Sequence, residues 1–215
     1  MKKIVTVVVC LLAAAPNFAS AQQIVFGKSW KEQRFSMLSS NDFTLSGDSL
    51  GVKSDGTVSL LWTSLPEAMW DKRQATWDWA VELSVPATDL SRKGGDDRNL
   101  SVYFIFLPED AAKGAQSKGV RALLNNPDAR VLMYIWGGAH ARGEMLPSPY
   151  LGARGRSIIQ RGAGIGTASE RVDLARDHRR AFGQEPQSLV GLAVSSDSDD
   201  TRTEVVARIS RMRIE

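Results

Sequence analysis

The chain has 215 residues, with 27 Lys and Arg, 24 Asp and Glu, and a formal net charge of +3. Hydrophobic residues make up 43% and charged residues 24%, which is the balance of an ordinary globular protein. This composition excludes a collagen, a coiled coil, a low-complexity chain and a protein with several membrane spans.

The N-terminus has the pattern of a secretory signal peptide. Lys2 and Lys3 precede an apolar run from Ile4 to Ala15, and small residues then lead to a cleavage site after Ala21. The run is too short to cross a bilayer, which takes about 20 residues. Cleavage removes the single cysteine, so we expect no disulfide. It also removes two lysines, and the remaining charge does not predict nucleic-acid binding. We expect a periplasmic or secreted protein without a membrane span, and one domain over residues 22–215.

Most of the remaining sequence has the period-two alternation of β-strands. Between Thr76 and Val85, Trp77 and Trp79 share one face with three aliphatic residues, which predicts a half-buried antiparallel strand. Three runs are apolar on both faces and predict central strands covered on two sides; they are Asn99–Leu107, Val131–Trp136 and Leu189–Val194. Shorter candidates are Phe43–Ser46, Thr57–Thr63 and Arg156–Arg161.

The last strand changes phase. Its apolar positions are Val205, Ala207 and Ile209, and then Met212 and Ile214. Such a slip by one residue predicts a β-bulge.

One segment, near residues 168–182, predicts a short helix. Thr167 and Glu170 have the spacing of a capping box, and Gly183 is a suitable residue to end the helix. A second segment, Lys113–Leu124, predicts either a weaker helix or a long loop. About ten strands and one clear helix favour an all-β, mainly antiparallel, jelly-roll-like β-sandwich.

Several short motifs occur in a characteristic order. They are Trp77-Asp78-Trp79, Gly95-Asp96-Asp97, Tyr134-Ile135-Trp136-Gly137, Pro149-Tyr150, Glu170-Arg171-Val172-Asp173, Asp177–Gly183 and Asp197–Thr201. In this order the sequence resembles the bacterial family called domain of unknown function 3047, over most of the mature chain. The chain has Asp-Ser-Asp-Asp-Thr where the family pattern has Asp-Thr-Asp-Asn-Thr. The resemblance implies an exported β-domain and brings no activity with it.

Aromatic residues are the first candidates for ligand binding. Trp77 and Trp79 share an apolar face, so we expect them in the core. Trp62 and Trp136 stand at strand ends and, with Tyr150, are candidates for stacking on a sugar ring.

Charged residues supply two further groups of ligand-binding candidates. In the predicted helix, Glu170, Asp173 and Asp177 fall on one face beside Arg171. They would bind a cation or a basic partner, form a solvated surface, or pair inward with Arg98 or Arg171 and hold the helix against the sheet. The glycine-rich loop after residue 136 contains His140, Arg142 and Glu144, in which His140 and Glu144 have the chemistry for acid–base work, unless the segment is a plain loop.

Five carboxylates are candidates for a metal site. Alternating oxygens in Asp197, Asp199 and Asp200 suit Ca²⁺, although they also suit an acidic turn between two strands. Asp96 and Asp97 form a similar turn, which would converge with the first if the two strands are neighbours.

The interpretation we favour is a non-catalytic protein that binds a glycan or another cell-envelope ligand. One alternative is a glycan-acting hydrolase or lyase that uses paired carboxylates, and another is a structural partner of envelope proteins. An enzyme needs two polar groups converging in a cleft, one of them a desolvated carboxylate. A binding protein needs a groove with exposed rings, and a structural partner needs a broad apolar patch.

Overall fold

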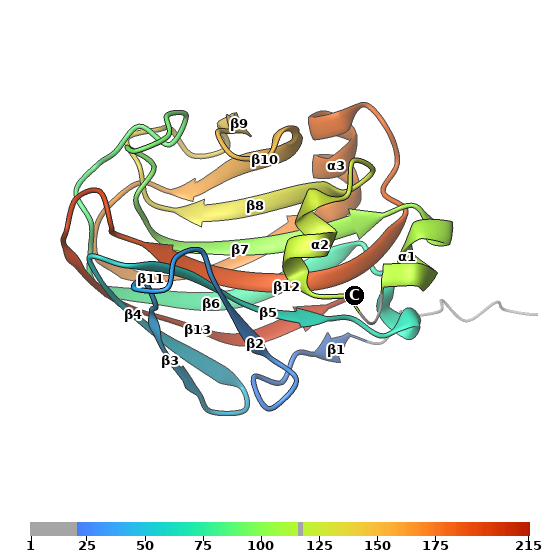
Figure 1. Ribbon diagram of the computed structural model, residues 1–215, viewed down its shortest axis with the longest axis horizontal. Coiled ribbons are helices and arrows are strands. Elements are labelled where there is room, and N and C mark those ends of the chain that lie inside the picture. The colour runs from blue at the N-terminus through green and yellow to red at the C-terminus, as the bar shows by residue number, and fades with distance from the viewer. Residues whose placement is uncertain (1–20, 116–117) are drawn as a thin grey trace, which may run out of the picture.

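The computed structural model describes residues 21–115 and 118–215, and it shows two β-sheets packed face to face (Figure 1). The six-stranded sheet has the order β11-β6-β13-β4-β3, with β1 beside β13. Its strands are β1 (Gln22–Gln23), β3 (Asp42–Leu45), β4 (Ser49–Asp55), β6 (Gln74–Leu83), β11 (Gly166–Asp173) and β13 (Glu204–Ile214).

The seven-stranded sheet has the order β2-β5-β12-β7-β8-β10-β9. Its strands are β2 (Lys31–Arg34), β5 (Val58–Ser64), β7 (Arg98–Leu107), β8 (Arg130–Trp136), β9 (Met145–Ser148), β10 (Gly152–Arg161) and β12 (Ser188–Asp197). Among the described strands, the pairing of β8 with β10 is parallel and every other pairing is antiparallel. The predicted all-β, mainly antiparallel sandwich is therefore confirmed.

The core lies between the two sheets and is centred on a tryptophan pair. Trp77 and Trp79, on β6, are 1% and 2% exposed, and their rings meet edge to face. Trp77 packs against Phe104 of β7 and Tyr134 of β8 in the opposite sheet. This contact confirms the predicted core position of the pair, and edge-to-face packing adds to the stabilisation from buried area.

The seven-stranded sheet is covered on both faces. On β7, Leu100, Val102 and Phe104 face the six-stranded sheet, whereas Tyr103 and Ile105 belong to a second apolar cluster on the outer face. Helices α1 (Glu109–Ala115) and α2 (Val120–Asn125) contribute to that outer cluster. The three predicted central strands are thus buried on both faces, as their continuous apolar runs indicate.

The predicted bulge in the last strand is confirmed. The register of β13 against β6 shifts between Ser210 and Arg213, and Arg211 has a φ of 51°. The shift keeps both halves of the apolar pattern, Val205 to Ile209 and Met212 to Ile214, in the core.

The predicted helix near 168–182 begins later than its capping-box pattern suggested. Residues up to Asp173 form β11, which pairs with β6, and α3 covers Leu174–Phe182. Asp173 is the N-cap and accepts a hydrogen bond from the Arg176 amide. Pairing with the tryptophan strand therefore overrides the local capping signal, while Gly183, with a φ of 70°, ends the helix as expected.

The predicted signal peptide falls on residues 1–20, outside the described residues, apart from its last residue. In the described part of the chain, no helix combines the length and the apolar character needed to cross a bilayer. A short 3₁₀ helix, η1 (Glu67–Met69), completes the described elements.

His178 on α3 predicts a loss of stability at acid pH. Its Nδ1 donates to the Gln184 carbonyl at 2.8 Å, and burial between Phe106 and Phe182 lowers its pKa below the ordinary 6.5. The unfolded chain therefore binds a proton below pH 6.5 that the folded chain binds less readily. We expect the free energy of unfolding to fall between pH 6.5 and 5, measured by urea denaturation.

His178→Asn is the matched variant, since its amide can still donate but does not titrate. We expect a smaller difference between the two pH values in this variant. An equal difference would show that other groups cause the acid sensitivity.

Candidate functional site

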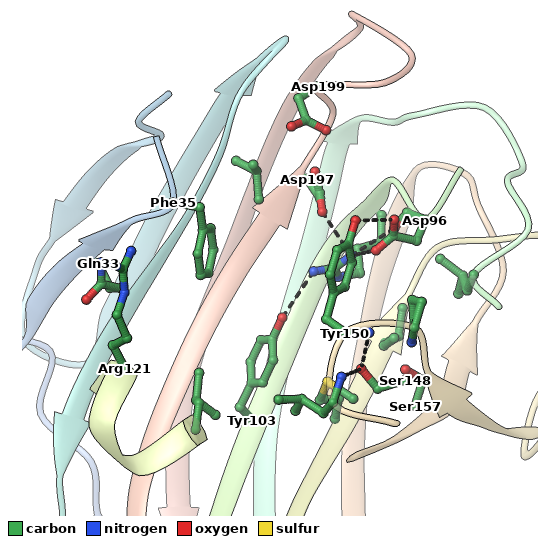
Figure 2. A pocket seen from close by; sticks show the side chains of 18 of the residues that line it. Gln33, Phe35, Asp96, Tyr103, Arg121, Ser148, Tyr150, Ser157, Asp197 and Asp199 are labelled. Atoms are coloured by element: carbon green, nitrogen blue, oxygen red, sulfur yellow. Dashed lines mark hydrogen bonds and ion pairs between the residues drawn. The ribbon is translucent and has the colours of Figure 1, made fainter. Parts of the chain in front are cut away.

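A pocket of about 630 Å³ opens on the outer face of the seven-stranded sheet (Figure 2). Strands β5, β7, β8, β10 and β12 contribute to it, together with α2, the end of β2 and the turn between β9 and β10. Its polar lining residues are Gln33, Asp96, Arg98, Tyr103, Arg121, Asn125, Ser148, Tyr150, Ser157, Asp197 and Asp199. Its apolar lining residues are Phe35, Val58, Leu90, Leu124, Met133, Ile135, Pro149 and Leu151.

Strand alternation brings the polar floor of the pocket together. Tyr103 on β7 and Ser195 on β12 point to the outer face, because their neighbours Val102 and Val194 face the core. β7 and β12 pair directly, with Asp197 opposite Arg98. Polar side chains near the ends of two adjacent apolar strands therefore converge.

Arg98 is the centre of a buried hydrogen-bond network. Its Nη1 donates to the Asp96 carbonyl at 2.8 Å, to Asp96 Oδ2 at 3.1 Å and to Asp197 Oδ2 at 3.0 Å. Its Nη2 donates to the Tyr103 hydroxyl at 3.1 Å, which in turn lies 3.0 Å from Ser195 Oγ. One guanidinium thus joins two carboxylates and a phenol from the loop before β7, from β7 and from β12.

The charges of this network shift the pKa values of its members. Burial opposes the charge of Arg98, but Tyr103, Asp197 and Asp96 raise its pKa above the ordinary value. Burial raises the pKa of Asp197 to about 8, against the effect of Arg98, and nearby carboxylates add to the rise.

One oxygen of Asp197 is unpaired. The residue is 6% exposed, and its Oδ1 has no hydrogen-bond partner among the described residues. A buried acceptor without a donor is costly, about 1–3 kcal/mol. Figure 2 shows Asp197 at the pocket, beside the side chains of Asp96 and Tyr150. Asp197 therefore brings an unsatisfied buried oxygen to the lining of the pocket.

Tyr150 forms one wall of the pocket and is the ligand-binding candidate that the structure places there. Its hydroxyl donates to Asp96 Oδ1 at 3.1 Å, and burial together with Asp96 raises its pKa to about 12. The residue is nevertheless 60% exposed, so a ring face is accessible. The turn that carries it packs closely on β10, since a Cβ at Gly155 would lie 2.8 Å from the Cβ atoms of Leu151 and Ser148.

The five predicted metal-binding carboxylates divide into two groups. Asp96 and Asp197 bind Arg98. Asp97, Asp199 and Asp200 offer ligand atoms within 4.8 Å of one another. The two turns converge, as expected for neighbouring strands.

Asp97, in the second group, also has a structural role. Asp97 Oδ2 accepts the Thr201 amide at 2.7 Å, and Oδ1 accepts the Asp200 amide at 3.4 Å. Burial and the charges of Asp199 and Asp97 raise the pKa of Asp200. Asp97 therefore holds the turn between β12 and β13 against β7, beside the pocket.

The two predicted stacking tryptophans are not exposed, so that expectation is corrected. Trp136 is 4% exposed, packs edge to face on Trp79 in the core and donates to the Gly164 carbonyl at 3.0 Å. Trp62 is 8% exposed in the outer apolar cluster and does not line the pocket. Strand alternation buries both, because each lies on a covered face.

The glycine-rich loop lies behind the pocket wall. His140 Nε2 accepts the amide of Leu90, a pocket residue, at 3.2 Å, and its Nδ1 lies 3.4 Å from Glu144. Arg142 extends away from this group to Glu170, with 2.9 Å between Nη2 and Oε2. None of the three predicted loop residues lines the pocket.

The predicted carboxylate face of the helix is also corrected. Glu170 lies on β11 and points inward, where it pairs with Arg142 and Arg161. Asp177 on α3 accepts the Tyr134 hydroxyl at 2.9 Å, and Asp173 caps the helix. These carboxylates therefore have different structural partners. Glu170 does pair inward, but with Arg142 and Arg161 and not with Arg98 or Arg171 as expected. Arg171 is exposed and bonds Gln74.

Sequence reasoning did not assign Phe35, Arg98, Tyr103, Arg121 or Ser157 to a binding site. Two signals were present. Tyr103 and Ser157 are polar positions within apolar strands, and Arg98 follows two acids at the start of a fully buried strand. Phe35 and Arg121 lie on a loop and on α2, and only the tertiary fold brings them to the pocket.

The fold and the pocket define a two-sheet antiparallel β-sandwich with a ligand-sized cavity on the outer face of its larger sheet. The chain belongs to the family described as "Protein of unknown function (DUF3047)", whose model matches residues 28–213. No sequence among the curated proteins matches it.

Two solved structures are similar in overall arrangement. One is the xyloglucanase domain of NopAA, a type three effector from Sinorhizobium fredii, in complex with cellobiose. It has a TM-score of 0.46 and 8% identity, covering 86% of this chain and 92% of that chain. The other is a loop swap mutant of Necallimastix patriciarum Xyn11A, with a TM-score of 0.44 and 14% identity, covering 93% and 97%.

The contacts of Asp97 give a testable prediction about the turn beside the pocket. We expect Asp97→Ala to lower the free energy of unfolding by about 1–3 kcal/mol, because two backbone amides lose their acceptor. Urea denaturation in EDTA and in CaCl₂ measures the effect. We expect the same decrease in the free energy of unfolding in both solutions if Asp97 acts only through its hydrogen bonds to the turn. A decrease that appears only with CaCl₂ would identify a calcium site.

Proposed function

We propose that this protein is exported and binds a short glycan or a similar polar cell-envelope ligand in the pocket on its seven-stranded sheet, without catalysis. The observation that carries the proposal is the combination of exposed rings with a fixed, buried polar network in one cavity. The volume of about 630 Å³ lies in the range of small-molecule sites, about 300–1,000 Å³.

The pocket has the two kinds of contact that sugars require. Tyr150 is 60% exposed and Phe35 is 52% exposed, and in Figure 2 they stand on opposite sides of the pocket. Aromatic rings offer flat apolar surface to the faces of a sugar. Hydroxyl groups donate and accept hydrogen bonds, which suits Asp197 Oδ1, Ser148, Ser157 and Gln33.

The rigidity of the site also supports binding. The Arg98 network fixes the carboxylates of Asp96 and Asp197 on paired strands before any ligand arrives. Groups fixed in advance lose little conformational entropy on binding, which favours affinity.

Isothermal titration with tetrasaccharides of glucose, xylose and N-acetylglucosamine tests this function. We expect at least one to bind, and Tyr150→Ala to weaken that binding about tenfold, because a stacked ring contributes about 0.5–1.5 kcal/mol beyond its buried area.

Leu38→Ala is the matched control, since Leu38 is 97% exposed, lies three residues from Phe35 and does not line the pocket. Its affinity should equal that of the unaltered protein. Absence of binding to every tetrasaccharide, or an equal loss in both variants, would contradict the proposed site.

The pocket also favours a second candidate, a glycan hydrolase. Asp197 is a desolvated carboxyl with one free oxygen, and it shares the Arg98 guanidinium with a second carboxyl, Asp96. Such an enzyme would protonate the glycosidic oxygen from one carboxyl as its bond to the sugar carbon breaks. The second carboxylate would accept a proton from the water that adds to this carbon. The engagement of both Asp96 oxygens, with Arg98 and with Tyr150, favours the non-catalytic function.

Release of reducing ends from the same tetrasaccharides separates the two candidates. We expect binding without release. Release that Asp197→Asn abolishes while binding persists would establish the hydrolase instead.

A further inference from the structure

The charged side chains around Asp197 indicate which chemical class of glycan the pocket binds. Three carboxylates, Asp96, Asp197 and Asp199, line the same end of the pocket. Arg98 pairs with two of them, because its Nη1 donates to both Asp96 and Asp197. Arg121, the other arginine of the lining, lies beside Gln33 on the opposite side in Figure 2. Lys93, over the Tyr150 ring, brings a second cation near this end, so the three carboxylates outnumber Arg98 and Lys93 by one.

Asp197 contributes an unpaired oxygen to this end of the pocket. Oδ2 is held by Arg98, while Oδ1 is buried and has no donor among the described residues. A carboxylate is satisfied most strongly by a charged donor, because charge-assisted hydrogen bonds are roughly twice as strong as neutral ones. A positively charged donor on the ligand would supply the missing hydrogen bond, and it would favour the ionised carboxylate against the burial that raises the pKa of Asp197 to about 8.

The neighbouring ring is suited to the same kind of group. The Lys93 ammonium stands 5.5 Å from the centroid of the Tyr150 ring, so this ring already accepts an amine cation. Tyr150 also bonds Asp96, which places an aromatic face next to the carboxylate cluster.

We propose that the pocket selects an amine-bearing ligand of the amino-sugar class, whose ammonium binds Asp197 Oδ1 with Asp199 nearby. This inference rests on the proposed glycan function. Asp197 is then the residue that determines specificity: it discriminates a sugar with a free amine from the same sugar with that amine blocked.

A matched pair of ligands tests the inference on the unaltered protein. The β-1,4-linked glucosamine tetramer and its fully N-acetylated form have the same backbone, but acetylation removes the positive charge. By isothermal titration in 150 mM NaCl, we expect the glucosamine tetramer to bind at least tenfold more tightly. Equal affinities, or tighter binding of the acetylated form, would overturn the inference.

Two variants locate the effect. Asp197→Asn keeps the shape of the side chain but removes its charge, so the preference for the free amine should fall below about threefold. Asp110→Asn removes an exposed carboxylate on α1, outside the pocket, and should leave both affinities unchanged. If both variants lose the preference equally, the amine is attracted only by the overall charge of the protein, and the inference is wrong. If Asp197→Asn does not fold, Asp199→Asn provides the second test, because Asp199 is exposed. We expect this variant to lose part of the preference for the free amine. An unchanged preference would count against the site.

Butylamine and cellotetraose distinguish the failure of this inference from that of the proposed function. Binding of cellotetraose without binding of either glucosamine tetramer overturns the amine specificity and leaves the glycan function standing. Binding of butylamine that Asp197→Asn abolishes, without binding of any oligosaccharide, supports the amine site and overturns the glycan function. Absence of binding to every probe overturns both.

Discussion

The pocket depends on one buried cation. Arg98 stands at the start of β7, and its guanidinium joins the preceding loop, β7 and β12 through Asp96, Tyr103 and Asp197. A buried arginine without these partners would destabilise the protein strongly, and the carboxylates would repel each other without the arginine. The buried guanidinium of Arg98 is therefore stable because Asp96, Asp197 and Tyr103 surround it. These side chains in turn are fixed because they bond to Arg98.

The two faces of the seven-stranded sheet differ, and only the outer face can hold the Arg98 network. Its inner face packs on Trp77 and Trp79 through apolar and aromatic side chains. Its outer face is covered only in part, by α1, α2 and the turn after β9. The pocket lies between α2 and this turn, so its polar side chains are in a region of low dielectric constant that a ligand can still reach. Hydrogen bonds and ion pairs are strongest in such a region.

The fold was more predictable than the site, for a physical reason. Strand alternation is local, so Trp77, Trp79 and the bulge near Arg211 could be inferred from neighbouring residues alone. The pocket instead joins positions distant in sequence, from Phe35 to Asp199, whose proximity depends on strand order. The convergence of Asp97 with Asp199 and Asp200 was predictable only on the condition that two strands were neighbours.

The incorrect assignments have a common origin. Glu170 and Trp136 were judged by local pattern, as a helical carboxylate and an exposed strand end, whereas both point into the sandwich. A local pattern does not reveal which sheet lies on the other side of a residue. The residues around Arg98 are acidic, as in a surface turn, yet Arg98 itself is 9% exposed, because Asp96 and Asp197 pair with it in the folded chain.

The tight fit of Gly155 under the turn that carries Tyr150 has a consequence for how this protein family can diversify. The base of the turn admits no side chain, since Leu151 and Ser148 already occupy the space, while its tip is exposed. Insertions at the tip would reshape the mouth of the cavity without disturbing β8 or β10. A methyl group at Gly155 would instead push the whole turn outward. We therefore expect relatives to vary in sequence and length at the tip and to share a glycine beneath it.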